Sequence, residues 1–237
     1  VGVSVGMTDR WSPGEAADAA VAGILAAVVS PEPGAPRGVG VDSPPGAGKA
    51  TLGVRSAREL VGAGEKIMIR AQTKLEFAWG LASRMAETIN TIGQPQVQQM
   101  LGEIAMFAEF ARTSLFAAEQ AAREYGNGMW ACDARPLLAL RAALPTWFPR
   151  TNEISRQLGA HNLLTTPARA ALDDEALRPL LEKYLKGVGA DAGQRSRVFR
   201  LAWDFAATAL GSRNEQYERF YLGSLGRALS WLQISGD

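Results

Sequence analysis

The sequence contains almost none of the side chains that form disulfides or hold zinc. Its 237 residues include one cysteine and one histidine. A single cysteine excludes an internal disulfide, and one cysteine with one histidine cannot supply the four ligands of a structural zinc site.

The chain also lacks an excess of charge of either sign, since it has 25 Lys and Arg and 24 Asp and Glu, for a formal net charge of +1. That balance gives no electrostatic basis for binding nucleic acid or an anionic membrane.

No hydrophobic run is long enough to cross a bilayer. The longest run near the N-terminus covers residues 19–29, well short of the ~20 apolar residues that a transmembrane helix needs. The segment before it carries Asp9, Glu15 and Asp18 with Arg10 as its one base, whereas a secretory signal begins with a basic region. We therefore expect a cytoplasmic protein with no membrane partner.

Aromatic residues are nearly absent from the first 70 positions. Only Trp11 of the six Trp, four Tyr and eight Phe lies there, whereas the same stretch holds 12 of the 25 glycines and 6 of the 12 prolines. A composition that changes so sharply indicates two unlike pieces. We predict an N-terminal segment over residues 1–71 and a second domain over residues 72–237.

The N-terminal segment has the order of elements that a phosphate-binding loop requires. Residues 37–42 indicate a short strand, a glycine-rich turn follows, residues 52–60 have helical spacing, and residues 66–70 indicate a second strand. Glycines let the backbone approach a phosphate closely, and the lysine supplies a positive charge. This β-α-β interpretation makes four residues candidates for phosphate binding, namely Gly46, Gly48, Lys49 and Thr51.

The segment resembles the start of P-loop ATPases but departs from their pattern at two positions. Ser43 stands where the first glycine belongs, and Ala50 stands where a Ser or Thr would bind Mg²⁺. Thr51 is one residue late, so its hydroxyl points about 100° away on a helix. A non-catalytic remnant or fusion is the first interpretation, and residual phosphate binding is the second.

The second domain is helical by its pattern. Apolar residues recur at spacings of three and four over residues 75–92, and Gly93 and Pro95 interrupt the run. A second long run follows and stops at residues 125–128, where Gly and Asn predict a helix end. Two long helices joined by a short turn pack antiparallel, so we predict a mainly α helical bundle.

Shorter helices complete the predicted bundle. One helix is expected to begin at Pro136, with interruptions at Pro145 and Pro149. Asp191 with Gln194 forms the pattern of a capping box. The remaining helices are expected over residues 151–159, 176–186, 195–210 and 214–232.

The sequence shows none of the usual combinations of catalytic residues. His161 is the one imidazole, and no local motif places a nucleophile beside it. Cys132 is best interpreted as a small packed residue. Glu103 and Glu109 are six apart, which does not place them on one face of a helix. We assign no catalytic residue.

Five separated blocks of the second domain nevertheless share one resemblance. They are residues 74–89, which begin Lys74-Leu-Glu-Phe-Ala-Trp79; Tyr125-Gly-Asn-Gly-Met-Trp130; Phe148-Pro-Arg150 with Glu153-Ile154; Gln157-Leu-Gly159; and Arg200-Leu-Ala-Trp-Asp204 continuing to residues 211–221, which begin Gly211-Ser-Arg-Asn214. In this order they resemble the C-terminal domain of the 4-hydroxyphenylacetate 3-hydroxylase family over residues 72–237.

The resemblance implies a helical bundle like the C-terminal domain of acyl-CoA dehydrogenases, which forms a homotetramer and part of a flavin site. Members are large components of two-component aromatic monooxygenases that hydroxylate phenols ortho to the hydroxyl group. A separate flavin reductase supplies their reduced FAD. By motif position, flavin contacts are implied for Gln157, Gly159, His161, Gly211, Ser212, Arg213 and Asn214.

Other interpretations of these residues stay open. His161 and the residue after it suit the end of a helix, and Arg213 suits an ion pair with Glu215 or Glu218. The family's catalytic Arg, Tyr and His lie in domains that precede this one, and no residue here matches them. We therefore expect no monooxygenase activity from this chain alone. The alternative functions are a non-catalytic helical assembly module and a P-loop nucleotide-binding protein with a helical appendage.

Overall fold

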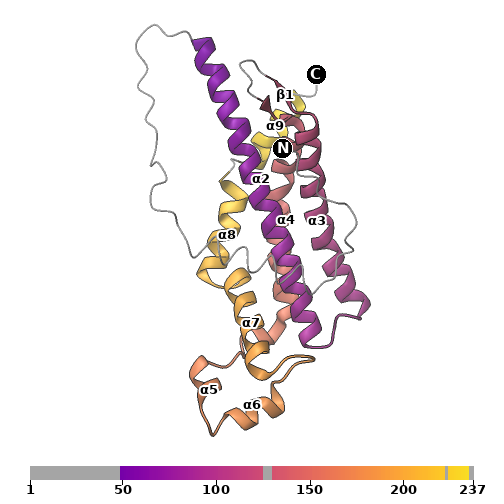
Figure 1. Ribbon diagram of the computed structural model, residues 1–237, viewed down its shortest axis with the longest axis vertical. Helices are drawn as coiled ribbons and strands as arrows, with labels where there is room; N and C mark the ends of the chain where they lie inside the picture. The colour runs from indigo at the N-terminus through magenta and orange to yellow at the C-terminus, as the bar shows by residue number, and fades with distance from the viewer. Residues whose placement is uncertain (1–48, 125–129, 222–223, 235–237) are drawn as a thin grey trace, which may run out of the picture.

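The computed structural model describes residues 49–124, 130–221 and 224–234, with side chains from residue 67 onward. These parts of the chain are almost entirely helical (Figure 1), which confirms the predicted fold class. The elements in chain order are α2 (Lys49–Thr88), α3 (Pro95–Gln120), β1 (Arg123–Glu124), β2 (Trp130–Ala131), α4 (Ala134–Gly159), the 3-10 helix η1 (Ala160–Leu163), α5 (Arg169–Asp173), α6 (Arg178–Tyr184), α7 (Ala192–Ala206), α8 (Ala209–Phe220) and α9 (Leu225–Ile234).

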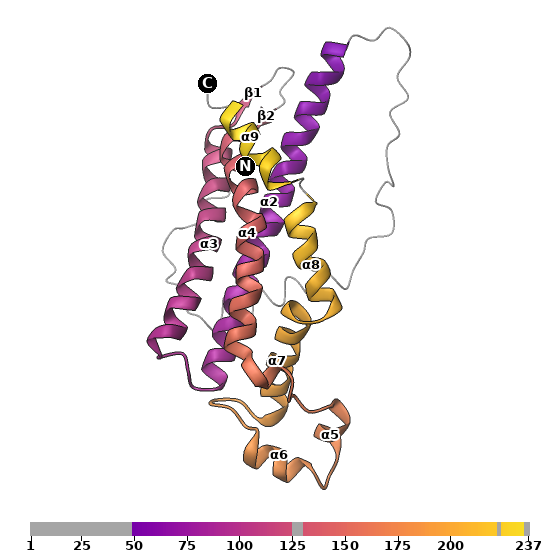
Figure 2. The ribbon, with the colours of Figure 1, turned by 180° about the vertical axis from the view of Figure 1, so that it is seen from behind.

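Three long helices form the body of the bundle. Helices α2 and α3 run antiparallel, as predicted, and α4 packs against both of them (Figures 1 and 2). Helices α7 and α8 continue along the side of α2 and α4, and α9 lies on α4. Strands β1 and β2 form a short antiparallel hairpin between α3 and α4 that the sequence did not predict.

The apolar core has two parts along the length of the bundle. One part lies where α2 turns into α3 and where α7 packs, and it includes Leu81, Met85, Ile104, Ile154 and Phe199. The other lies further along α2, α3 and α4, and it includes Met68, Leu75, Ala111, Leu140 and Leu144. All of these residues except Leu81 are 2% exposed or less. Burial of apolar residues on facing sides of the helices therefore holds the bundle together.

The predicted β-α-β unit is wrong in its second strand. Residues 66–70 belong to α2, which continues without a break from Lys49 to Thr88. Met68 and Ala71 are buried there, three residues apart, as core positions of a helix are. The helix also runs through residue 71, where we placed the domain boundary. The first strand, Gly46 and Gly48 lie outside the described residues, and Lys49 and Thr51 lie in the first turn of α2.

Helix α4 differs from the prediction because it runs through both of its internal prolines. Pro145 and Pro149 each remove a backbone hydrogen bond, a change that costs about 3 kcal/mol in an unsupported helix. Leu144 and Phe148, directly before them, are buried in the core. Packing on both sides of the prolines therefore keeps residues 134–159 in one helix.

A small lobe, residues 164–190, projects from the end of the bundle (Figure 1). It contains α5 and α6, which have no fully buried residue. The lobe joins the bundle where the amide of Val188 donates to the carbonyl of Thr88 at 2.9 Å. A Cβ on Gly187 would lie 2.6 Å from that same carbonyl oxygen, so this close approach requires a glycine. The capping box of Asp191 and Gln194 is confirmed at the start of α7, just after the lobe.

A buried ion cluster connects α2 to α8. The side chain of Glu218 is 2% exposed, and its carboxylate accepts from Lys74 Nζ at 2.6 Å and from Arg70 Nη2 at 3.1 Å. Arg70 Nη1 also pairs with the same carboxylate. The Arg70 guanidinium lies 4.6 Å from the ring centre of Tyr217, and burial raises the pKa of the Tyr217 hydroxyl. One carboxylate therefore pairs with two cations of the neighbouring helix.

No helix in the described part of the chain combines the length and apolar character that crossing a membrane requires.

Replacing Glu218 should destabilise the fold more than replacing an exposed glutamate. We expect Glu218→Gln to lower the free energy of unfolding by about 2–3 kcal/mol, because it leaves two cations uncompensated; their partial contact with water keeps the loss below that of a fully buried pair. Glu109→Gln, which breaks an exposed pair with Arg112, should cost less than about 0.5 kcal/mol. Urea denaturation of the two variants checks this, and equal losses would contradict it.

Candidate functional site

The first group of predicted site residues lies at the end of α4. Gln157 is exposed, and its amide donates to Glu153 at 2.9 Å. Gly159 is buried at the last position of the helix. His161 follows in η1 with its side chain exposed. The chain turns sharply between them, since Ala160 has a φ of 43°, an unusual value for a residue with a Cβ.

The second group opens α8. Thr208 caps this helix, and its hydroxyl accepts from the amide of Gly211 at 3.4 Å. Ser212 and Arg213 are exposed and Asn214 is half-buried. These residues therefore occupy the first turns of a helix, where the helix dipole favours an anion, although Thr208 already accepts from the N–H groups of Gly211 and Ser212.

Polar contacts bring the two groups into one region. Asn152 of α4 donates to Glu215 of α8 at 3.1 Å, and Arg156 lies 3.9 Å from the same carboxylate. Arg156 also donates to the carbonyl of Ala206 at 2.8 Å, at the C-terminal end of α7. Side chains directly next to Gln157 and Asn214 thus connect the end of α4 to the start of α8. The structure places both predicted groups on neighbouring helix ends.

The two glycines fill packing roles in this arrangement. A Cβ on Gly159 would lie 2.5 Å from the Leu163 side chain, and one on Gly211 would lie 2.7 Å from the carbonyl oxygen of Phe205. The chain's own atoms therefore occupy the space that each missing side chain leaves. Gly211 lets α8 start directly against the end of α7, which positions the residues that follow it.

The alternative interpretation of Arg213, an ion pair with Glu215 or Glu218, is not what the structure shows. Glu218 pairs with Arg70 and Lys74, as described above, and Glu215 lies 3.6 Å from Arg219 in addition to its contacts with α4. Among the described residues no carboxylate pairs with Arg213. Its guanidinium therefore stands exposed on the first turns of α8 with its charge uncompensated by a neighbour.

The acidic residues considered from the sequence are held by arginines. Glu103 accepts two hydrogen bonds from Arg150, both at 2.8 Å, and these bonds keep the pKa of Glu103 below its usual value against the opposing effect of burial. Glu109 is held in the same way by Arg112, which lowers its pKa. Within the part of the chain that the structure describes, no three His, Cys, Asp or Glu residues gather as metal ligands would.

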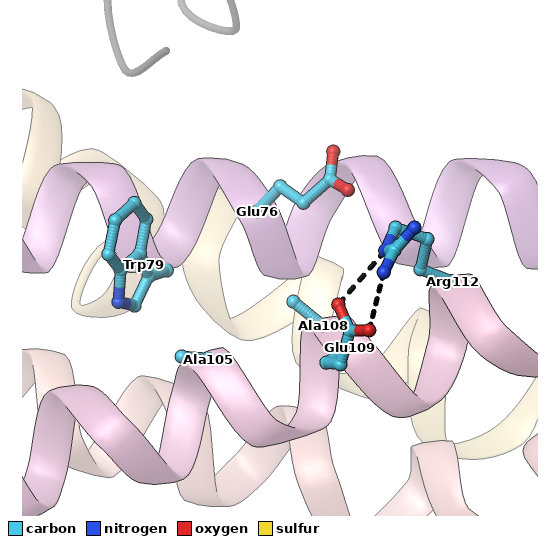
Figure 3. A pocket seen from close by; sticks show the side chains of 6 residues that line it. All are labelled: Glu76, Trp79, Ala105, Ala108, Glu109 and Arg112. Atoms are coloured by element: carbon cyan, nitrogen blue, oxygen red, sulfur yellow. Dashed lines mark hydrogen bonds and ion pairs between the residues drawn. The ribbon is translucent and has the colours of Figure 1, made fainter. Parts of the chain in front are cut away.

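A groove between α2 and α3 was not predicted from the sequence. It has a volume of about 280 Å³ and is lined by Glu76, Trp79, Ala105, Ala108, Glu109 and Arg112. In Figure 3, Trp79 on α2 faces the two alanines on α3, and the Glu109–Arg112 pair closes one end. Two small residues, three apart on α3 and opposite an aromatic on α2, are the pattern that could have indicated this groove.

The comparisons with known proteins agree with one another. The profile of the family described as 4-hydroxyphenylacetate 3-hydroxylase, C-terminal, matches residues 63–237. The oxygenase component of 4-hydroxyphenylacetate 3-monooxygenase from Thermus thermophilus is 37% identical over 150 residues, which are 63% of this chain and 31% of that protein.

Solved structures show the same likeness. The oxygenase component (HpaB) of 4-hydroxyphenylacetate 3-monooxygenase, crystallised with FAD, has a TM-score of 0.71 and 33% identity; the match covers 75% of this chain and 37% of that one. An archaeal 4-hydroxybutyryl-CoA dehydratase from N. maritimus, with 16% identity and a TM-score of 0.61, shares the fold over 72% of this chain and 36% of its own. This chain therefore spans about a third of the length of these proteins.

The packing role of Gly211 leads to a direct test. We expect Gly211→Ala to lower the free energy of unfolding by about 1–3 kcal/mol, because the new methyl group meets the backbone of α7. Gly102→Ala is the matched control, since that helical glycine has open space around its missing Cβ. The control should raise stability by about 0.5–1 kcal/mol through the better helix propensity of alanine. Thermal denaturation measures both, and a stable Gly211→Ala variant would contradict the packing role.

Proposed function

Because the chain belongs to the 4-hydroxyphenylacetate 3-hydroxylase C-terminal family, we propose that it is the flavin-binding, oligomerising domain of a monooxygenase that uses reduced FAD. The reaction is hydroxylation of a phenol ortho to its hydroxyl group, in the cytoplasm. A separate flavin reductase supplies the reduced FAD, a role that the name "oxygenase component" of the relatives supports. One of the related structures was crystallised with FAD, which supports the choice of cofactor.

The described residues suit the binding of a flavin at the ends of α4 and α8. Bound reduced FAD supplies the electrons that activate molecular oxygen. In this proposal Arg213 holds a phosphate oxygen of the cofactor, and Ser212 and Asn214 donate to its phosphate or ribityl groups. Gln157 and His161 contact the cofactor from the end of α4. Gly159 and Gly211 contribute indirectly. Each allows the close backbone packing at its helix end, because the chain's own atoms fill the space where a Cβ would lie.

The unpaired Arg213 is the observation that carries this proposal. An exposed guanidinium at a helix start adds its charge to the N-terminal end of the helix dipole, and both attract a phosphate. The glutamates nearest in sequence are engaged by Arg70, Lys74, Arg156 and Arg219. Nothing in the described part of the chain therefore competes with an anionic ligand for this arginine.

The activity itself is proposed to require more than this domain. The chain spans 31% of the Thermus thermophilus relative, and we assign none of its residues to the hydroxylation step. Its part is to bind and orient the cofactor and to assemble copies. The groups that bind and deprotonate the phenol are proposed to lie in the domains that complete the longer relatives.

Assembly has its own structural support on α3. This helix leaves Met106, Phe110 and Phe116 between 46% and 60% exposed. Large apolar side chains exposed together on one helix are typical of interaction surfaces. We propose that further copies of the chain cover them in a homo-oligomer, a tetramer as in the resembling family. The same residues support the second candidate function, an assembly module that binds no flavin.

Flavin binding separates the two candidates. We expect the chain to bind FAD, reduced with dithionite under anaerobic conditions, and Arg213→Gln to weaken that binding about tenfold, the loss of one charge-assisted contact. Isothermal titration calorimetry measures both, with Arg84→Gln as a control that removes an exposed arginine elsewhere on the bundle. No binding of oxidised or reduced FAD at high micromolar concentration would leave the assembly module as the function. An unchanged affinity in Arg213→Gln would remove the role of that residue.

The oligomer is tested by a charge placed on α3. We expect the chain to form oligomers in light scattering and Phe116→Glu to dissociate them, because a carboxylate cannot be buried there without a partner. Leu164→Glu is the control, since Leu164 is 73% exposed in the projecting lobe. A monomeric wild-type chain, or equal effects of the two variants, would contradict an α3 interface.

A further inference from the structure

A hollow lined by arginines lies between the projecting lobe and α7. Its volume is about 300 Å³, and it is bordered by α5, α6 and α7. The charged side chains around it are those of Arg169, Arg178, Arg197 and Arg200, with Asp173, Glu182 and Asp191. Three separate elements thus bring four guanidinium groups to one place.

The carboxylates of this hollow are already engaged. Asp173 accepts from Arg169 at 2.8 Å, and this bond lowers the pKa of Asp173. Glu182 accepts from the first backbone N–H of α7 at 3.2 Å. Asp191 caps the same helix, with a hydrogen bond of 2.6 Å from the N–H of its third residue. One arginine therefore pairs with Asp173, and two backbone N–H groups hold Glu182 and Asp191 in place while these two carboxylates keep their negative charge.

Three of the four arginines have no ion-pair partner among the described residues. Arg178 Nε donates to the carbonyl of Leu172 at 3.4 Å, and Arg200 donates to the carbonyl of Pro167. Arg197 has an exposed side chain and borders the hollow, and it makes no hydrogen bond with the residues that the structure describes. Carbonyl oxygens are neutral acceptors, so these hydrogen bonds do not offset the arginine charges; the Glu182 and Asp191 carboxylates in the same lining offset them in part, and the four arginines outnumber the three acids.

The packing of the lobe gives an independent reason to expect a ligand. No residue of α5 or α6 is fully buried, and Leu180 and Tyr184 of α6 are 54% and 73% exposed. Apolar burial therefore contributes little to holding α6 near α7. An anion held by Arg178 from α6 and by Arg197 and Arg200 from α7 would join the two elements.

We propose that this hollow is a binding site for a phosphate group, either inorganic phosphate or the diphosphate of a nucleotide. Guanidinium groups bind phosphate oxygens through paired N–H donors, which is the geometry that several arginines around one small hollow provide. None of the residues that line this hollow is one of the proposed flavin contacts, so the two proposals are tested on different residues. The proposal therefore does not depend on the binding of FAD.

Inorganic phosphate and ADP are the probes that test the site on the full chain. We expect each to bind in calorimetric titrations at constant ionic strength and to raise the melting temperature. Arg197→Gln and Arg178→Gln should each weaken binding about tenfold, which corresponds to about 1.4 kcal/mol. Arg123→Gln removes an equal charge from the hairpin at the opposite end of the bundle (Figure 1) and should leave binding unchanged.

The controls separate a site from a general salt effect. Phosphate stabilises many proteins by exclusion from their surface, and such an effect would be equal in wild type and in all three variants; that result would overturn the proposal. Two arginine variants are used so that a folding defect in one, detected by circular dichroism without phosphate, leaves the other informative. Tighter binding of ADP than of phosphate would identify a nucleotide as the ligand, and the reverse order would identify free phosphate. No binding of either probe at concentrations up to about 10 mM, which is above the dissociation constant of a weak specific complex, would also overturn the proposal.

Discussion

The buried carboxylate of Glu218 is the interaction on which the placement of the candidate site depends. It is held by Arg70 and Lys74 of α2, and so it fixes α8 against the longest helix of the bundle. A buried carboxylate tolerates only a position where its cations reach it, because an uncompensated charge is costly away from water. This pairing fixes the rotation of α8 about its own axis and its position along α2. That rotation places Glu215 against α4 and leaves Arg213 facing outward.

Close backbone packing sets the second constraint. Gly211 allows α8 to start against the last carbonyls of α7, and Gly159 allows Leu163 to fold back over the end of α4. The family resemblance implies flavin contacts for both glycines, and in the structure the chain's own atoms fill the space at both Cβ positions. The polar donors around them stand on the surface. A cofactor would therefore lie across the ends of these helices, where the other domains of the longer relatives or a second copy can cover it.

Much of the bundle follows from local patterns, and its exceptions have identifiable causes. Helical spacing predicted two parts of α2, residues 52–60 and 75–88, and it predicted α3, while the Asp191–Gln194 pattern predicted the start of α7, because these signals depend on neighbouring residues. Residues 66–70 were mistaken for a strand since a short apolar run fits either structure. The pairing of Arg70 with Glu218 joins residues 148 apart, and no local pattern shows it. The site residues came from a family resemblance, whereas their burial and partners required the fold.

Hydrogen–deuterium exchange of the full chain, with and without reduced FAD, tests the central claim most directly. The account predicts that the cofactor slows exchange of the backbone amides in the first turns of α8, around Ser212 to Asn214, and at the end of α4, around Gln157 to His161. It predicts little change in α3 and in the hairpin of β1 and β2, which serve as internal references. Binding of FAD with protection elsewhere, or with none at the starts and ends of these two helices, would contradict it.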